Sequence, residues 1–203
     1  MKPRHFSLRF SLLGGLLCLL IGWLALSAPS ALALSGKIRE FATPTAGSAP
    51  LEITKGPDGA IWFTEVNANQ IGRISPTGHI REFAIPTANS GPIAITAGPD
   101  GALWFTENNA NQIGRITTVG VVTEYPIPTA NSGPIGIIAG PDGNLWFTEN
   151  PGNNIGRISP TGKHKVVEYP IPTAGSAPVG IAAGSDGTLW FAEANANQIG
   201  QVR

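Results

Sequence analysis

Four glutamate residues are the side chains in this sequence best suited to chemistry, because each one ends a copy of the same short motif. The motif reads Gly-Pro-Asp-Gly-Ala-Leu-Trp-Phe-Thr-Glu at residues 98–107, and its other copies occupy residues 56–65, 140–149 and 184–193. The glutamates are Glu65, Glu107, Glu149 and Glu193. Carboxylate oxygens are the ligands that hard cations such as magnesium and calcium prefer. A fold that gathers these side chains around one axis would therefore provide a metal site.

A structural role for the same glutamates is the alternative, because a residue used once per repeat often satisfies the same buried groups in every copy. In that case each carboxylate accepts hydrogen bonds from the asparagine-rich loop that follows it. The motif alone does not decide between a shared metal site and four separate structural contacts.

The other groups that could do chemistry are few. His79 and His164 both follow Pro-Thr-Gly turns, which predicts exposed loop positions away from the glutamates. The sequence contains no Ser-His-Asp arrangement, no Cys-His pair, no zinc-ligand spacing and no phosphate-binding loop. We therefore assign no catalytic residue from the sequence.

The spacing of the motif indicates the architecture that must position these residues. Its tryptophans, Trp62, Trp104, Trp146 and Trp190, are 42, 42 and 44 residues apart. The repeats are 51–92, 93–134, 135–178 and a shortened 179–203, and each full repeat holds four short apolar runs separated by turn residues. Four short strands per repeat of this length, with no helical periodicity, are typical of a blade of an all-β propeller. A solenoid is the competing repeat fold, but its repeat would be shorter.

The two ends of the repeat region suggest how the propeller closes. Residues 37–41 match the fourth strand at 79–83, whereas residues 198–203 form a third strand without a fourth. We expect strand 37–41 to complete the last blade and close a ring of four four-stranded antiparallel blades, which would remove both sheet edges. The alternatives are an open arc, which a second chain could complete as a homodimer, and a part of a larger six- or seven-bladed propeller.

The amino-terminal segment predicts export. Basic residues Lys2, Arg4 and Arg9 precede an apolar run from Phe10 to Leu26, and Ala-Leu-Ala at 31–33 provides a cleavage site. Residues 1–33 therefore resemble a secretory signal peptide, and residues 34–203 form the propeller domain of a secreted, periplasmic or extracellular protein. An uncleaved signal that anchors the chain in a membrane is the alternative.

The composition limits the classes of molecule that the chain is expected to bind. The chain has 13 basic and 13 acidic residues, and removal of the signal peptide leaves an excess of acidic groups. No basic stripe remains for phosphates, so nucleic acid is not an expected partner. Cleavage would also remove the membrane segment and Cys18, the only cysteine, so packing alone must hold the folded domain.

One rim of the predicted propeller carries many asparagines. Connections alternate between the two rims of an up-and-down blade, so the loops after the second strands share a rim with the links between blades. The asparagines of these loops are Asn67, Asn69, Asn109, Asn111, Asn153, Asn154, Asn195 and Asn197. We expect this rim to bind a small molecule or a peptide-like ligand.

Three recurring motifs carry a family resemblance that covers nearly all of residues 37–203. They are Gly-Pro-Asp-Gly-x-Leu-Trp-Phe-Thr-Glu, Asn-x-Ile-Gly-Arg-Ile and Glu-Tyr-Pro-Ile-Pro-Thr, and they resemble the repeat of the virginiamycin B lyase family, also called streptogramin lyases. The resemblance implies a β-propeller, usually of seven blades. It also implies a role in antibiotic resistance, in which cyclic type B streptogramins are opened by elimination with Mg²⁺ and a histidine base.

The match is incomplete at the positions that hold the family's catalytic and metal-binding residues. The family's catalytic histidine aligns with Leu51, Ile93, Ile135 and Val179, and its second metal-binding glutamate aligns with Ala49, Gly91, Gly133 and Ala177. Only the Trp-Phe-Thr-Glu glutamates remain of the implied Mg²⁺ site. We therefore expect a secreted binding module of this family without chemistry. A carbon–oxygen lyase that opens type B streptogramins is the alternative, and the sequence leaves open whether the chain is an enzyme.

Overall fold

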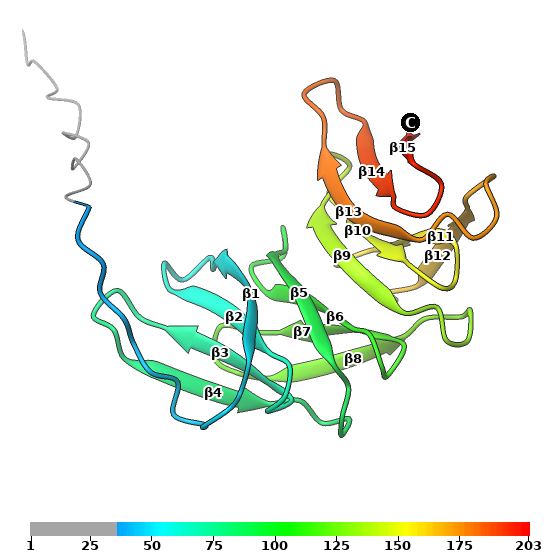
Figure 1. Ribbon diagram of the computed structural model, residues 1–203. Coiled ribbons are helices and arrows are strands. Elements are labelled where there is room, and N and C mark those ends of the chain that lie inside the picture. Colours follow the sequence, from blue (N-terminus) through cyan, green and yellow to red (C-terminus); the bar gives the residue numbers. More distant parts are fainter. Residues whose placement is uncertain (1–35) are drawn as a thin grey trace, which may run out of the picture. The chain divides into compact units, whose positions relative to one another are not determined.

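The computed structural model describes residues 36–203, which form short β-strands joined by tight turns (Figure 1). The signal peptide predicted for residues 1–33 lies outside the described residues. Within the described part, no helix is long and apolar enough to cross a membrane. Strands of five or six residues follow from the sequence, because turn-forming Gly, Pro, Asp and Asn interrupt every apolar run.

The strands fall into four sheets, and each sheet corresponds to one sequence repeat. The first sheet holds β1 (Pro50–Lys55), β2 (Ile61–Glu65), β3 (Gln70–Ile74) and β4 (Ile80–Ala84). The second holds β5 (Pro92–Ala97), β6 (Leu103–Glu107), β7 (Gln112–Ile116) and β8 (Val122–Pro126). The third holds β9 (Pro134–Ala139), β10 (Leu145–Glu149), β11 (Asn154–Ile158) and β12 (Val166–Pro170). The last holds β13 (Pro178–Ala183), β14 (Leu189–Glu193) and β15 (Gln198–Val202).

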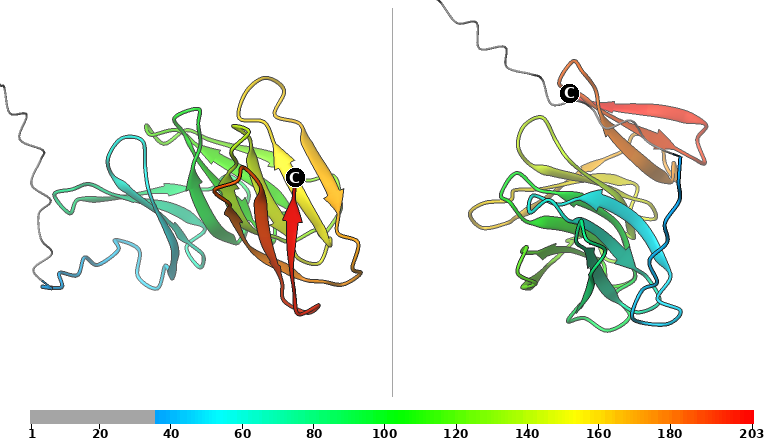
Figure 2. Two further views of the ribbon diagram at one scale, coloured as in Figure 1. Left: turned by 90° about the horizontal axis from the view of Figure 1, so that it is seen from above. Right: turned by 90° about the vertical axis from the view of Figure 1, so that its left-hand side faces the viewer.

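Every sheet is an antiparallel meander in which sequential strands are neighbours. The first strands of successive sheets lie side by side, with β1 against β5, β5 against β9 and β9 against β13. Figure 2 shows the sheets as successive colour groups from cyan to red. This arrangement confirms the prediction of propeller blades, and we refer to the four sheets as blades 1 to 4.

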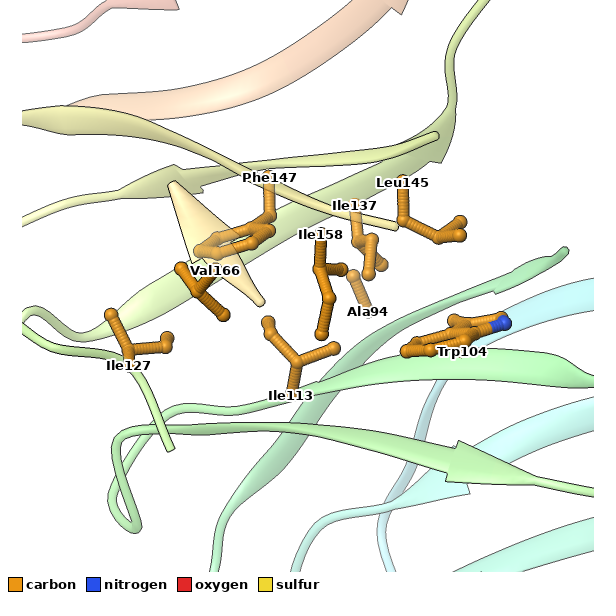
Figure 3. Packing of buried hydrophobic residues seen from close by; sticks show 9 residues of the cluster. All are labelled: Ala94, Trp104, Ile113, Ile127, Ile137, Leu145, Phe147, Ile158 and Val166. Atoms are coloured by element: carbon orange, nitrogen blue, oxygen red, sulfur yellow. The ribbon is translucent and has the colours of Figure 1, made fainter. Parts of the chain in front are cut away.

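The hydrophobic core lies between blades. Between blades 2 and 3, Trp104 and Ile113 of the former pack with Phe147 and Ile158 of the latter (Figure 3). The corresponding residues of blades 1 and 2 form a second cluster, and those of blades 3 and 4 form a third. Each joint therefore packs the tryptophan face of one blade on the phenylalanine face of the next.

Glycines in the third strands make these faces flat enough to pack. Gly114 in β7 pairs with Phe105 in β6, and the phenyl ring lies over the glycine. A Cβ atom at position 114 would collide with that ring. Gly72, Gly156 and Gly200 hold the same place in the other blades. The Ile-Gly-Arg part of the repeat is thus a packing requirement.

On the rim with the Pro-Asp-Gly turns, the aspartates of blades 1 and 2 connect their turns to a tryptophan and an arginine. The Trp104 indole Nε1 donates to Asp100 Oδ1 at 3.0 Å, and Arg115 Nε donates to Asp100 Oδ2 at 2.7 Å. Asp58, Trp62 and Arg73 form the same group in blade 1. Burial would raise the pKa of Asp100, but the hydrogen bonds from Trp104 and Arg115 lower it below its ordinary value.

The prediction that residues 37–41 form a strand and complete the last blade is wrong. Residues 37–41 form no strand, and the last sheet has only the three strands β13, β14 and β15. Phe41 instead lies against Gly78 in the β3–β4 turn of blade 1, as Phe83 lies against Gly120 in the corresponding turn of blade 2. Phe41 thus occupies the place of a fourth-strand residue from a blade preceding blade 1, and the open arrangement held as an alternative describes the structure.

Candidate functional site

The four motif glutamates occupy equivalent places, each at the end of the second strand of its own blade. Glu65, Glu107 and Glu149 are fully buried, and Glu193 is 6% exposed. The strand geometry explains the burial, because the preceding Trp-Phe-Thr residues are enclosed on both sides by neighbouring blades in the middle of the array.

Each of the three fully buried carboxyls has a second glutamate as its neighbour. Burial, with a further contribution from the nearby Glu124 of β8, raises the pKa of Glu107 to about 8, while Ser90 opposes the shift. Burial also raises the pKa of Glu149, where Glu168 is the neighbour, and that of Glu65, where Glu82 is the neighbour. The interiors of blades 1 to 3 therefore favour the protonated form of the motif glutamate.

The partner glutamates are anchored by the link that leads into their own blade. Thr87 N donates to Glu124 Oε1 at 2.9 Å, and Thr129 N donates to Glu168 Oε1 at 2.9 Å. In blade 1, Thr45 donates to Glu82 twice, from its N at 2.9 Å and from its Oγ1 at 2.7 Å. These bonds fix the partner glutamates beside the motif glutamates of the same blade.

Several oxygens of the motif glutamates have no hydrogen-bond partner within the described residues, including both oxygens of Glu65 and of Glu107. Orphaned carboxylate oxygens are compatible with a bound cation, but magnesium and calcium take about six oxygen ligands or more. Among residues 36–203, no group of three or more His, Cys, Asp or Glu side chains is placed to hold a metal ion. Within this part of the chain, Glu65, Glu107, Glu149 and Glu193 therefore do not form one such group.

Five of the eight rim asparagines serve the fold. Asn111 has a φ of 59° and donates from Nδ2 to Thr129 O at 2.9 Å, while its Oδ1 accepts from Ser132 N at 2.7 Å. Asn69 and Asn153 make the same contacts in their blades. Asn197 shares the positive φ, and Asn154 is buried and donates to Glu149 Oε2 at 3.1 Å. Asparagine is suited to this left-handed backbone position.

The remaining rim asparagines have accessible side chains. Asn67, Asn109 and Asn195 are exposed at equivalent positions of the loops after β2, β6 and β14. Asn67 Nδ2 donates to Gly47 O at 3.3 Å, and Asn109 lies against Gly91. These three amides leave hydrogen-bonding capacity toward solvent, and they are the rim residues that a ligand could contact.

The histidines lie on the rim that the sequence predicts, but only His79 is exposed and His164 is partly buried. His79 and His164 belong to the β3–β4 and β11–β12 turns, at the strand ends opposite the motif glutamates. His164 packs against Tyr125 and Trp104 of the preceding blade, with ring centroids 4.8 and 5.9 Å apart. At the positions that align with the family's histidine, the structure places apolar Leu51, Ile93, Ile135 and Val179 at the starts of first strands.

Sequence reasoning missed the buried serines of this rim. Ser90 and Ser132 are fully buried and influence the pKa of Glu107 and Glu149, and Ser48 does the same for Glu65. The signal was available, because Ser48, Ser90, Ser132 and Ser176 recur at the repeat spacing. It was hard to recognise because serine is common in links between strands.

Comparison with known proteins gives matches to one family. The Virginiamycin B lyase family profile matches residues 30–203. A curated virginiamycin B lyase from Saccharopolyspora erythraea is 48% identical over 40 residues, which cover 20% of this chain and 13% of that protein.

Solved structures agree with the profile. Selenomethionine-substituted virginiamycin B lyase from Staphylococcus aureus is 52% identical with a TM-score of 0.80, and the match covers 83% of this chain and 57% of the enzyme. A catalytically inactive variant of that enzyme, solved with quinupristin, matches equally well. A streptogramin B lyase is 44% identical with a TM-score of 0.74, and 81% of this chain and 58% of that chain are covered. The chain thus spans somewhat more than half the length of these solved relatives.

Proposed function

Because the chain belongs to the virginiamycin B lyase family, we propose that it binds a cyclic, peptide-like ligand of the streptogramin B class on its asparagine-rich rim, without opening it. The quinupristin complex of the Staphylococcus aureus relative supports this ligand class. The export signal predicted at residues 1–33 would place the binding event outside the cytoplasm.

One observation carries the non-catalytic part of the proposal. The four rim positions that align with the family's histidine hold Leu51, Ile93, Ile135 and Val179, and both histidines of the described residues lie at the opposite strand ends. Ring opening by elimination requires a base within hydrogen-bond reach of the proton that is removed. An aliphatic side chain cannot take that role.

The lyase activity is the second candidate, since the identity to the Staphylococcus aureus enzyme is 52%. Glu107, with its pKa raised to about 8, is the strongest carboxylate base of this rim in its ionised form. Its side chain is fully buried, however, so a substrate could reach it only after the blade opens. The buried position favours binding over catalysis.

The test is to incubate the purified chain with quinupristin and to measure binding by isothermal titration calorimetry and the ligand's fate by chromatography with tandem mass spectrometry. Elimination opens the ring without changing its mass, whereas hydrolysis adds one water, so chromatographic separation is essential. We expect saturable binding and unchanged cyclic ligand. Accumulation of the linear isomer, with or without added Mg²⁺, would overturn the proposal in favour of the lyase.

Variants locate the binding surface. The double substitution Asn67→Ala and Asn109→Ala should weaken quinupristin binding about tenfold, as expected for the loss of one or two hydrogen bonds. His79→Ala on the opposite rim is the matched control and should leave the affinity unchanged. Equal affinity for all three proteins would place the ligand elsewhere.

A further inference from the structure

The two rims of the blades differ in the sign of their charged side chains. Lys55 ends β1, and Lys163 and Lys165 lie in the β11–β12 turn, so these lysines are at the rim with the Pro-Asp-Gly turns, which we call the turn rim. The third strands of blades 1 to 3 carry an arginine next to the strand end at this rim, Arg81 is the second residue of β4, and Arg203 follows β15. All lysines and arginines between residues 42 and 203 therefore lie near the turn rim.

The asparagine-rich rim carries glutamates instead. The motif glutamates end the second strands there, and their three partner glutamates are held at this rim by hydrogen bonds from Thr45, Thr87 and Thr129 of the links. The one further glutamate between residues 42 and 203 is Glu52, which follows Leu51 near the start of β1. No lysine, arginine or histidine of this range lies on the asparagine-rich rim, so the charged side chains that the range places there are all acidic.

Within the described residues, the ion pairs involve aspartates rather than glutamates. They join Asp58 to Arg73 and Asp100 to Arg115 on the turn rim, with N–O distances of 2.7 Å. No glutamate between residues 42 and 203 is paired in this way with a basic side chain of the same range. Both carboxyl oxygens of Glu107 also lack a hydrogen-bond partner in this part of the chain. Charges in protein interiors are normally paired, and the positive charge that would complement these glutamates is not supplied by residues 42–203.

The paired glutamates keep negative charge beneath the rim near neutral pH. A pair of carboxyl groups, such as Glu107 with Glu124, becomes neutral only when it holds two protons. Near neutral pH a second proton is not expected, since glutamic acid in water ionises well below neutrality. The weakly polarisable interior around such charges concentrates their field toward the open rim. A cation is thus favoured at this rim, and an anion is disfavoured.

The exposed asparagines present acceptor atoms outward. Asn67 donates from Nδ2 to Gly47 O at 3.3 Å, so its amide nitrogen is used within the protein and its Oδ1 remains to accept. Asn109 likewise has its Nδ2 toward Gly91. An amide oxygen accepts a hydrogen bond from an ammonium group but cannot donate one to a carboxylate. The polar atoms of the rim and the charge beneath it therefore favour the same kind of ligand.

We propose that the asparagine-rich rim selects ligands that carry a protonated amine. The positive charge complements the glutamates beneath the rim, and the N–H groups of the amine donate to the asparagine oxygens. The inference rests on the function proposed above, and it adds a positive charge to the peptide-like character of the ligand. Complementary charge of this kind mainly provides specificity and faster association, so ligands that bear a carboxylate or phosphate are rejected.

The potential of each rim can be measured without any ligand. Nuclear magnetic resonance records the relaxation of backbone amide protons of the purified chain in the presence of two nitroxide probes, which share one ring and differ in an aminomethyl or a carboxyl substituent. The cationic probe should relax the amides of Asn67 and Asn109 at least about twofold more than the anionic probe does. The order should reverse at Lys163 and Lys165. Equal relaxation by both probes at the asparagines, or stronger relaxation by the anion, would overturn the inference.

Ligand selectivity is measured by calorimetry with two cyclic peptides that differ only in a lysine or an acetyl-lysine. The lysine peptide should bind about tenfold more tightly at low salt, and the difference should shrink in concentrated salt because mobile ions screen the rim. Equal affinities, or no binding of either peptide at millimolar concentration, would refute the selection of amines. Quinupristin is titrated in parallel, so the two proposals can fail separately. Saturable quinupristin binding without a preference between the peptides would leave the proposed function intact.

Matched variants separate the charge from the shape of the rim. Glu124→Gln removes one charge and keeps an oxygen that can accept from Thr87 N, so it should weaken binding of the lysine peptide about threefold and leave the acetyl-lysine peptide unchanged. Asp186→Asn removes the same charge from the turn rim and should change neither affinity. Glu168→Gln repeats the test in blade 3 if the first variant does not fold. An equal loss for both peptides would mean that the glutamate acts through the structure of the rim, and would contradict the electrostatic selection.

Discussion

The hydroxyl group of Thr106 donates a hydrogen bond to the carbonyl oxygen of Ile135, 2.9 Å away, and thereby connects β6 of blade 2 to β9 of blade 3. Thr106 Oγ1 also accepts from Ala94 N at 3.0 Å, so the hydroxyl joins two first strands through one second strand. Thr64 and Thr148 repeat the arrangement, which makes it the regular polar contact of an otherwise apolar joint.

Thr106→Val should destabilise the fold by about 1–3 kcal/mol, because the isosteric valine leaves Ala94 N without its buried acceptor and Ile135 O without its donor. The free energy of unfolding from urea titration, followed by tryptophan fluorescence, measures the effect. Ala192→Val, at the equivalent place on blade 4, is the control and should change stability much less. A loss of equal size in both variants would indicate that side-chain shape matters here and the hydrogen bonds do not.

Gly114→Ala should destabilise by about 1–3 kcal/mol or prevent folding, since its Cβ would collide with the buried ring of Phe105. The same atom would come within 2.7 Å of a carboxylate oxygen of Glu107. Gly180→Ala in β13 is the matched control, because a Cβ there meets no atom within 4 Å. Thermal unfolding of both variants should separate them by several degrees, and similar melting temperatures would contradict the packing role of Gly114.

Asp100→Asn should lower the free energy of unfolding by about 1–2 kcal/mol near neutral pH. The substitution removes the charge-assisted hydrogen bond with Arg115 but keeps an acceptor for Trp104. The pKa of Asp100 is lowered in the folded state, so its stabilising contribution exists above its unfolded value of 3.8 and is lost as the pH falls. The difference between the wild type and the variant should therefore shrink in acid. Asp186→Asn is a control at an exposed aspartate of blade 4, where Gln201 replaces the arginine, and a comparable loss there would argue against the role of the ion pair.

Glu107→Gln should stabilise the protein at alkaline pH by up to about 3 kcal/mol. The pKa of Glu107 is raised from an ordinary 4.5 to about 8 in the folded state, so the folded protein holds a proton there that the unfolded chain releases. Its contribution is complete below 4.5 and is lost as the pH rises toward 8. Glutamine imitates the protonated acid, since it is neutral and has nearly the same shape.

Unfolding titrations between pH 4 and pH 9 test this prediction, with about one point per pH unit. The free energy of unfolding of the wild type should fall as the pH rises through this range, whereas that of Glu107→Gln should depend less on pH. Glu52→Gln, at an exposed acid outside the repeated sets, should follow the wild type. Parallel profiles for all three proteins would mean that Glu107 is ionised when buried.

The repeat allowed the blades to be predicted from the sequence. The four apolar runs predicted for the repeat 93–134 became the four strands β5 to β8, because turn residues border every run. The rims were also predictable, since antiparallel meanders alternate their connections, and His79 and Asn109 lie on the expected sides.

The path of residues 37–41 could not be predicted, because the sequence shows that the segment resembles a fourth strand but not which blade it approaches. Phe41 reaches Gly78 of the next blade, and the link before β1 attaches to that blade through Thr45 and Glu82. The pairing of Glu107 with Glu124 was equally hidden. Glu107 was recognised as a recurring acid, but its burial beside Glu124 depends on the fold of the link that carries Ser90.

The contacts of each joint involve only two adjacent blades, as in the cluster of Trp104 and Phe147. An array built in this way can be lengthened by duplicating one unit of its gene, since a new member meets the same surfaces as the one it displaces. Natural variation in the size of such molecules then requires no redesign of their interiors, and only the outermost surfaces need to adapt.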